Sequence, residues 1–194
     1  MRRRSFRIGL LRHGETEGGA RYRGVTDDPL TTTGWEQMWR ATSMENRWDG
    51  IVTSPLRRCA QFAYAFAQQH ALHVHVDERL RELDFGRWEG RTAVDILKTE
   101  PEALSLFWRD PWNHSPPDGE SLPALQARVL AAWNDLAMQG RSVLVIAHGG
   151  PLRVILCHTQ RKSMEEFFAI DVPYAVLRRV EVTMPEAALS ESTT

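Results

Sequence analysis

The 194-residue sequence has few cysteines, almost no net charge and no long apolar run. Its two cysteines, Cys59 and Cys157, form no C-x-x-C pair, and we expect both to be small buried side chains rather than a disulfide. A formal net charge of −1 argues against nucleic acid or an anionic membrane as a partner, so any cationic site must be local. No apolar run approaches the roughly 20 residues of a membrane-spanning helix.

The two ends of the chain are polar. Met1-Arg2-Arg3-Arg4 resembles the basic start of a secretion signal, but Arg7 interrupts the short apolar segment that follows it. We therefore expect a cytoplasmic protein with a frayed basic start. Residues 186–194 are small, polar and acidic and are predicted to form a loose tail. Residues 1–185 are long enough for one domain with a sizeable core.

Apolar strand-like runs alternate with helix-like stretches along the chain. This alternation predicts an α/β fold with a mostly parallel sheet. Because the last two runs flank Pro173-Tyr174, they are expected to include an antiparallel edge. The predicted strands, about six, cover residues 6–11, 50–53, 73–76, 142–147, 168–172 and 176–183.

Capping residues predict where several helices begin. Thr33 and Glu36 form a capping-box pattern that opens a helix over 34–45. Ser54 followed by Pro55 predicts a helix over 55–70. A third, amphipathic helix is predicted over 122–138.

Residues 84–120 fit the alternation of strands and helices poorly. They contain Trp88, Trp108 and Trp112, four prolines and a polar turn near 118–121. We interpret this stretch as a cap-like insertion over the mouth of a site. The alternative is that its tryptophans only fill a small secondary core, and both interpretations can hold for different residues.

The predicted strands near 6–11 and 142–147 each end in a His-Gly pair, with His13 and His148. Since ligands bind at the carboxyl ends of parallel strands, the two imidazoles are expected to share one pocket. Arg12 beside the first histidine makes that pocket suitable for a phosphate. A histidine placed in this way can be a metal ligand, a general base or a nucleophile. The adjacent guanidinium disfavours the metal and favours an anionic substrate.

Two further segments offer charged groups near strand ends. Arg57 and Arg58 lie in the first turn of the helix predicted after Ser54, where free N–H groups also favour an anion. Charge alone does not say which arginine faces the pocket. Glu82 follows the strand predicted over 73–76 and could serve as acid and base in phosphoryl transfer to water. The carboxylates Asp84 and Glu78 remain alternatives.

Four motifs now occur in a recognisable order: Leu11-Arg12-His13-Gly14-Glu15-Thr16, Ser54-Pro55-Leu56-Arg57-Arg58, Glu82 before Phe85-Gly86-Arg87-Trp88-Glu89-Gly90, and Ala147-His148-Gly149-Gly150. Together they resemble the histidine phosphatase superfamily, in its phosphoglycerate-mutase-like branch, over about residues 8–183. The resemblance implies a three-layer α/β/α sandwich around the predicted sheet.

The resemblance also implies a role for each of five residues. His13 would be the nucleophile that takes the phosphoryl group, and Arg12 would clamp its oxygens. The family's Ser-x-Leu-x-Arg pattern falls on Arg58 rather than Arg57, which makes Arg58 the second clamp. Glu82 would donate the proton to the leaving group, and His148 would contact the phosphoryl oxygens. No metal or other cofactor is implied.

Four more residues are candidates for binding phosphate or substrate through the same resemblance. Thr16 closes the first motif, and the backbone N–H of Gly149 follows the second histidine. Arg23 and Gly24 fall in a segment that resembles the family's substrate loop, although Arg23 stands where family members often carry a polar uncharged residue. The expected partner is a small phosphorylated metabolite, with no nucleic acid or membrane, and a homodimer is left open.

Within the superfamily, several segments look closest to the alpha-ribazole-5′-phosphate phosphatases of cobalamin assembly. The implied activity is hydrolysis of a phosphate monoester through a phosphohistidine, and the three tryptophans of the insertion could stack on a flat heteroaromatic base. A phosphoglycerate mutase or a broad-specificity phosphatase is the main alternative, and an inactive phospholigand-binding module is a remote one. The segments that carry this resemblance are Gly18-Gly19, Asp27-Asp28-Pro29-Leu30-Thr31, Phe85-Gly86-Arg87-Trp88-Glu89-Gly90, Pro117-Asp118-Gly119-Glu120-Ser121 and Val172-Pro173-Tyr174-Ala175.

Overall fold

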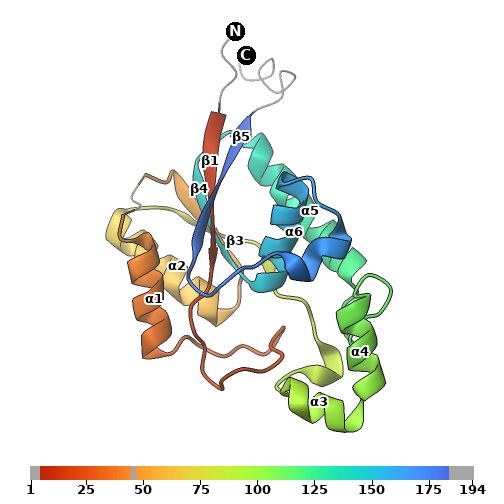
Figure 1. Ribbon diagram of the computed structural model, residues 1–194. Coiled ribbons are helices and arrows are strands. Elements are labelled where there is room, and N and C mark those ends of the chain that lie inside the picture. Colours follow the sequence, from red (N-terminus) through yellow and green to blue (C-terminus); the bar gives the residue numbers. More distant parts are fainter. Residues whose placement is uncertain (1–4, 45–46, 184–194) are drawn as a thin grey trace.

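One five-stranded sheet forms the centre of the computed structural model, which describes residues 5–44 and 47–183 (Figure 1). The strand order is β3-β2-β4-β1-β5. The pairs β2–β3, β2–β4 and β1–β4 are parallel, whereas β5 pairs with β1 in the antiparallel direction. The expected α/β class, with a mostly parallel sheet and an antiparallel edge strand, is confirmed. The strands are β1 (Ser5–Arg12), β2 (Gly50–Thr53), β3 (Val74–Val76), β4 (Val143–Ala147) and β5 (Leu177–Thr183).

No strand forms over 168–172, so residues 5–44 and 47–183 contain five strands rather than the predicted six. Met164–Ala169 forms a 3₁₀ helix (η3), and the chain then runs to β5 without strand pairing. Between η3 and β5, Ile170 and Val172 are buried in the core but do not join the sheet. A short apolar run indicates that a segment is buried. Burial alone does not distinguish a strand from a loop that faces the core.

Helices cover both faces of the sheet. The core on one face joins α1 (Thr32–Thr42) and α2 (Arg57–His70) to side chains such as Leu144 and Ile146 of β4. The core on the other face joins α5 (Leu122–Met138) and α6 (Gly149–Thr159) to alternate β4 residues. Because successive side chains of a strand point to opposite faces, the fully apolar β4 serves both cores. The result is a three-layer sandwich.

Two of the predicted helix starts are wrong by two residues. Helix α1 begins at Thr32, and its cap is Thr31, whose hydroxyl oxygen accepts a hydrogen bond from the Gly34 N–H at 2.9 Å. Helix α2 begins at Arg57, and the Ser54 hydroxyl accepts the Leu56 N–H without joining the helix. Helix α5 has the predicted bounds, with Ser121 as its cap and a proline in its first turn.

The predicted insertion at 84–120 contains a 3₁₀ helix η2 (Gly86–Trp88) and helices α3 (Ala93–Thr99) and α4 (Pro101–Arg109). In Figure 1 α3 and α4 project below α5, beyond the carboxyl ends of the parallel strands. Among the described residues no helix is long and apolar enough to cross a membrane. Both cysteines are buried and free. The predictions for residues 1–4 and 186–194 concern residues outside the described part of the chain.

Candidate active site

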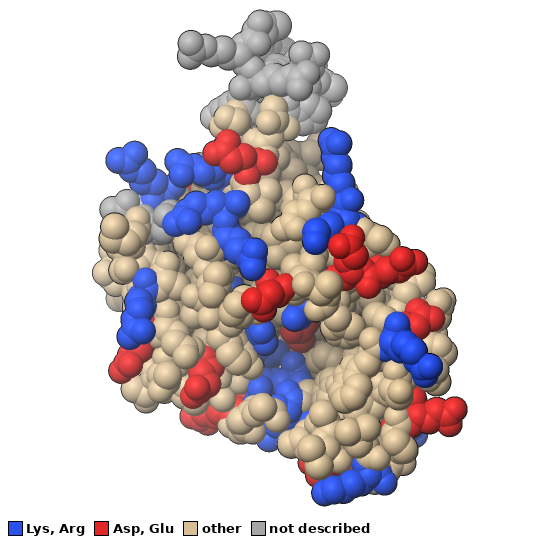
Figure 2. All heavy atoms as spheres, in the orientation of Figure 1, with Lys and Arg blue, Asp and Glu red and all other residues tan. Residues whose placement is uncertain are grey.

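A cavity of about 350 Å³ opens where β1 and β4 end and the segments after them begin. Arginine dominates its polar lining, and Figure 2 shows Lys and Arg side chains gathered in a hollow on this part of the surface. A cavity with this lining favours an anionic ligand. Its lining residues are Arg12, His13, Ala20, Arg21, Tyr22, Arg23, Glu82, Phe85, Ala93, Gly149, Arg153 and Tyr174.

His13 lies directly after β1 and is 4% exposed. Its Nδ1 lies 2.8 Å from the carbonyl oxygen of Gly14, so Nδ1 must carry the proton and Nε2 keeps its lone pair. This is the backbone hydrogen bond that a nucleophilic imidazole requires to fix its tautomer. Burial lowers the pKa of His13 well below its usual value, and the charges of Arg58 and Arg12 lower it further. The ring is therefore neutral at pH 7.

Arg12 lines the cavity beside His13, with Tyr174 packed against both. The Arg12 guanidinium carbon lies 4.1 Å from the centre of the Tyr174 ring, and the Tyr174 and His13 ring centres are 5.4 Å apart. One terminal nitrogen of Arg12 donates to the Val172 carbonyl at 2.6 Å. The backbone N–H of Ala175 approaches the carbonyls of Arg12 and His13, which ties this loop to the end of β1.

Arg58 and His148 are fully buried and lie behind the cavity lining. The His148 ring centre is 5.1 Å from that of His13. Arg58 Nε donates to His148 Nδ1 at 3.1 Å, so His148 carries its proton on Nε2 and donates to the Ser54 hydroxyl at 2.7 Å. Burial lowers the pKa of His148 well below its usual value, and the charge of Arg58 lowers it further. The two predicted histidines therefore share one site.

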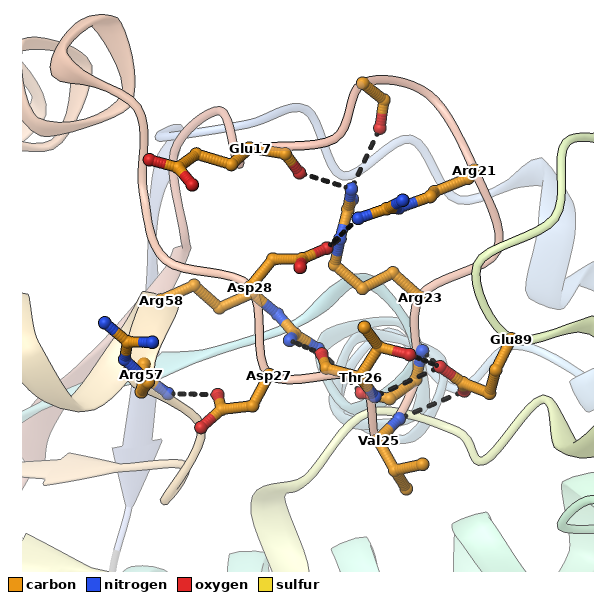
Figure 3. Close-up of polar contacts among 12 residues, drawn as sticks. Glu17, Arg21, Arg23, Val25, Thr26, Asp27, Asp28, Arg57, Arg58 and Glu89 are labelled. Carbon is orange, nitrogen blue, oxygen red and sulfur yellow. Dashed lines mark hydrogen bonds and ion pairs between the residues drawn. The ribbon is translucent and has the colours of Figure 1, made fainter.

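The loop between residues 17 and 28 forms one wall of the site (Figure 3). Asp28 accepts hydrogen bonds from Arg21 and Arg23, and a second Arg23 nitrogen donates to the carbonyls of Glu17 and Gly19. Arg23 is only 8% exposed and lines the cavity beside this anchor.

The carboxylate of Glu89, a residue without a predicted role, holds the next part of this loop. It accepts hydrogen bonds from the backbone N–H groups of Gly24, Val25 and Thr26, and from the Thr26 hydroxyl. The carbonyls of Gly24 and Thr26 in turn accept hydrogen bonds from Arg58 (Figure 3). Glu89 thereby fixes the acceptors that orient a buried guanidinium.

Glu82 is the one of the three candidate carboxylates that lines the cavity. Its Oε1 accepts the backbone N–H groups of Leu83 and Gly150, each at 2.9 Å, and its Oε2 accepts no hydrogen bond from the described residues. Oε2 is thus the oxygen available to carry a proton. Asp84 instead accepts the Gly86 N–H within its own turn, and Glu78 pairs with Arg81 at the surface.

The cavity brings together five of the nine predicted site residues: Arg12, His13, Arg23, Glu82 and Gly149. Arg58 and His148 do not line the cavity: the His148 ring centre lies 5.1 Å from that of His13, and Arg58 donates to His148. Gly24 lies in the wall, where its carbonyl holds Arg58. Thr16 is buried beside a neighbouring cavity that Tyr174 also lines. Arg57, the alternative to Arg58, is exposed.

The lining residues that were not predicted as candidates include Arg153 and Tyr174. Arg153 lies four residues after Gly149, on the same face of α6, so helical spacing could have suggested it. Tyr174 stands in one of the segments that carry the alpha-ribazole phosphatase resemblance, but no role was assigned to it, and its place in the cavity depends on a loop. None of the tryptophans expected to stack on substrate lines the cavity. Trp88 is buried in the core, and Trp108 and Trp112 are partly exposed, with Trp108 donating to the Tyr22 hydroxyl at 2.8 Å.

Comparison with known proteins agrees with this geometry. The family model described as histidine phosphatase superfamily (branch 1) matches residues 8–192. The chain belongs to this family. The histidine phosphatase chain is 33% identical over 192 residues to a bifunctional protein of Mycobacterium tuberculosis. This match covers 95% of the chain but 50% of that relative. The chain therefore spans about half the length of the first curated relatives that it matches.

Two solved structures resemble the histidine phosphatase chain over most of its length. The alpha-ribazole phosphatase from Shigella flexneri is 27% identical, with a TM-score of 0.81 over 90% of this chain and 89% of that chain. A mycobacterial glucosyl-3-phosphoglycerate phosphatase is 28% identical, with a TM-score of 0.81 over 92% and 91%. The fold is thus shared by enzymes whose names give different substrates.

Proposed function

We propose that the protein hydrolyses a phosphate monoester through a phosphohistidine at His13, without a metal ion. The observation that carries this proposal is the hydrogen bond from His13 Nδ1 to the Gly14 carbonyl, in a ring kept neutral by burial. Nε2 of His13 therefore holds a lone pair beside the guanidinium of Arg12. Only a neutral imidazole can attack phosphorus.

In the first step Nε2 of His13 forms a bond to phosphorus while the bond to the ester oxygen breaks. Arg12 binds the phosphoryl oxygens, and the N–H of Gly149 at the start of α6 adds a donor and the positive end of a helix dipole. Glu82 Oε2 gives its proton to the departing oxygen, which leaves as an alcohol. Charge stabilisation of this kind is the main contribution of a protein to phosphoryl transfer.

In the second step water attacks the phosphohistidine, and the Glu82 carboxylate takes the proton of that water. The bond from phosphorus to Nε2 breaks, inorganic phosphate leaves, and His13 returns to its neutral form. Arg58 and His148 support both steps. The His148 ring lies beside that of His13, and the positive charge of Arg58, which donates to His148, acts on His13.

Alpha-ribazole 5′-phosphate is our first candidate substrate. The likeness to the Shigella flexneri enzyme supports it, and so do the aromatic side chains that line the cavity, Tyr22, Phe85 and Tyr174. They offer faces on which a heteroaromatic base can stack. Glucosyl-3-phosphoglycerate is the second candidate, because the mycobacterial phosphatase is equally similar in fold and sequence.

The phosphoenzyme is the test of the proposed chemistry. Wild-type protein mixed with a phosphate ester and quenched rapidly in denaturant should carry a phosphoryl group that peptide mapping places on His13. His13→Ala should neither trap phosphate nor turn over. The matched control is His73→Ala, which changes the exposed histidine directly before β3. This variant should behave as wild type. Turnover by His13→Ala at the wild-type rate would refute the proposal, and chelator in the assay tests its metal independence.

Substrate choice needs a separate comparison. We expect kcat/KM to be highest for alpha-ribazole 5′-phosphate among a panel that includes glucosyl-3-phosphoglycerate and simple sugar phosphates. Product analysis with 3-phosphoglycerate and a bisphosphate primer distinguishes a mutase from a hydrolase, because only a hydrolase releases inorganic phosphate in stoichiometric amounts. Equal rates across the panel would exclude alpha-ribazole phosphate as the selected substrate.

A further inference from the structure

Arg153 lines the cavity without a role in the chemistry described above. It extends from α6 one turn after Gly149, and its Nε donates to the Ile170 carbonyl at 2.9 Å. Its guanidinium carbon lies 5.8 Å from the centre of the Phe167 ring. Its terminal nitrogens make no hydrogen bond or ion pair with any residue in the described part of the chain. The stem is therefore fixed, while the end is free to bind a ligand.

Three charged groups converge above Gly149, where a side chain is missing. A carbon attached to its Cα would lie 2.8 Å from Arg153 Nη1, 3.6 Å from the guanidinium carbon of Arg12 and 3.6 Å from Glu82 Oε2. The absence of a side chain leaves this point free. An oxygen atom placed near it would be within reach of two guanidinium groups and of Glu82 Oε2.

Arg153 Nη1 and Glu82 Oε2 lie on the same side of the cavity, because both approach the point above Gly149. The nucleophile and the proton donor must stand on opposite sides of the phosphorus, because the attacking and departing atoms are roughly in line. The oxygen beside Glu82 and Arg153 is therefore the departing one.

We propose that Arg153 is a further catalytic residue, which donates a hydrogen bond from Nη1 to the leaving-group oxygen. The proposal rests on the phosphohistidine mechanism proposed above. As the bond from phosphorus to that oxygen breaks, Glu82 supplies the proton that completes the alcohol. Arg153 keeps its own protons and stabilises the negative charge that develops before the proton arrives.

The dependence on leaving group tests this role. Removing one such donor typically lowers the rate about 10²–10³-fold. We expect Arg153→Met to lose activity to that extent with an alkyl phosphate, whose alkoxide is a poor leaving group. With p-nitrophenyl phosphate the loss should be less than about tenfold, because nitrophenolate leaves without help. Arg153→Lys should recover part of the alkyl activity, and Arg40→Met, at an exposed position of α1, should match wild type.

The outcomes separate this proposal from the one on which it rests. An equal loss with both esters would overturn the leaving-group role, since a residue that binds phosphoryl oxygens or merely supports the fold affects both substrates alike. No loss with either ester would overturn it as well. Phosphoenzyme formation on His13 from p-nitrophenyl phosphate is measured in parallel. Its persistence in Arg153→Met shows an intact site, and its absence in wild type would refute the phosphohistidine mechanism itself.

Discussion

At the scale of single residues, the position of Glu82, the proposed proton donor, depends on a glycine that faces it. The N–H of Gly150 holds Glu82 Oε1 at 2.9 Å, and a Cβ on Gly150 would lie 2.3 Å from that same oxygen. Gly150→Ala must therefore displace the carboxylate, which is the end of a flexible side chain. We expect kcat to fall about 10²-fold, the usual effect of moving a catalytic group by about 1 Å. Steady-state kinetics checks the rate.

The unfolding temperature of Gly150→Ala should stay within a few degrees of wild type, because alanine suits a helix. Gly50→Ala is the matched control, since its Cβ would make an ordinary 3.5 Å contact far from Glu82. Wild-type kcat in Gly150→Ala would show that the position of the carboxylate does not limit turnover.

The predicted residues that line the cavity include those that stand at the ends of predicted strands. His13 and Gly149 follow strands, and the topology of a parallel sheet brings such positions together. Tyr174 could not be found in this way, because a loop without regular hydrogen bonding delivers it to the cavity. Burial lowers the pKa of His13 more than the charges of the neighbouring arginines do, and no sequence pattern predicts this.

At the scale of elements, Glu89 joins the loop of residues 24–26 to the start of the insertion. Its carboxylate accepts hydrogen bonds from the loop and also from the Phe85 N–H. Glu89→Gln leaves one acceptor oxygen and turns an N–H group toward donors. We expect a loss of about 2 kcal/mol in unfolding free energy, as for other hydrogen bonds to a charged group. Because the loop holds Arg58, kcat/KM should fall too.

Hydrogen exchange measured by mass spectrometry locates the Glu89→Gln effect. Exchange should accelerate in residues 22–28 and remain unchanged in the strands β2 and β4. Glu36→Gln, an exposed position on α1, supplies the control and should alter neither stability nor exchange. Unchanged protection of the loop in Glu89→Gln would contradict the anchoring role of this carboxylate.

Sequence patterns predicted most elements to within two residues, and they failed where tertiary contacts decide. Ile170 and Val172 are buried in the core that also contains residues of α6 and the insertion, whereas Phe168 is exposed, and the segment forms no strand. The contacts of the tryptophans could not be predicted either, because composition does not say which of them faces a cavity. Trp88 fills the core, and Trp108 donates to the hydroxyl of the lining residue Tyr22 without lining the cavity itself.

At the scale of the whole molecule, two buried neutral histidines couple the active site to folding. His13 and His148 have pKa values well below that of an unfolded histidine, mainly because of burial. Above pH 6.5 both folded and unfolded chains hold these rings neutral, and the rings make no difference to stability. Below pH 6.5 these two imidazoles bind protons in the unfolded chain but not in the folded chain, so the free energy of unfolding must fall.

The expected slope is up to about 1.4 kcal/mol of unfolding free energy per pH unit for each histidine, continuing until the folded pKa is reached. Urea unfolding between pH 7.5 and 5 measures it, above the range in which most carboxylates titrate. His13→Gln removes one of the two rings and should lower the slope by about half. His73→Gln removes an exposed ring and should leave the slope unchanged. A stability independent of pH across this window would mean that the folded protein protonates both rings, and a protonated His13 could not serve as the nucleophile.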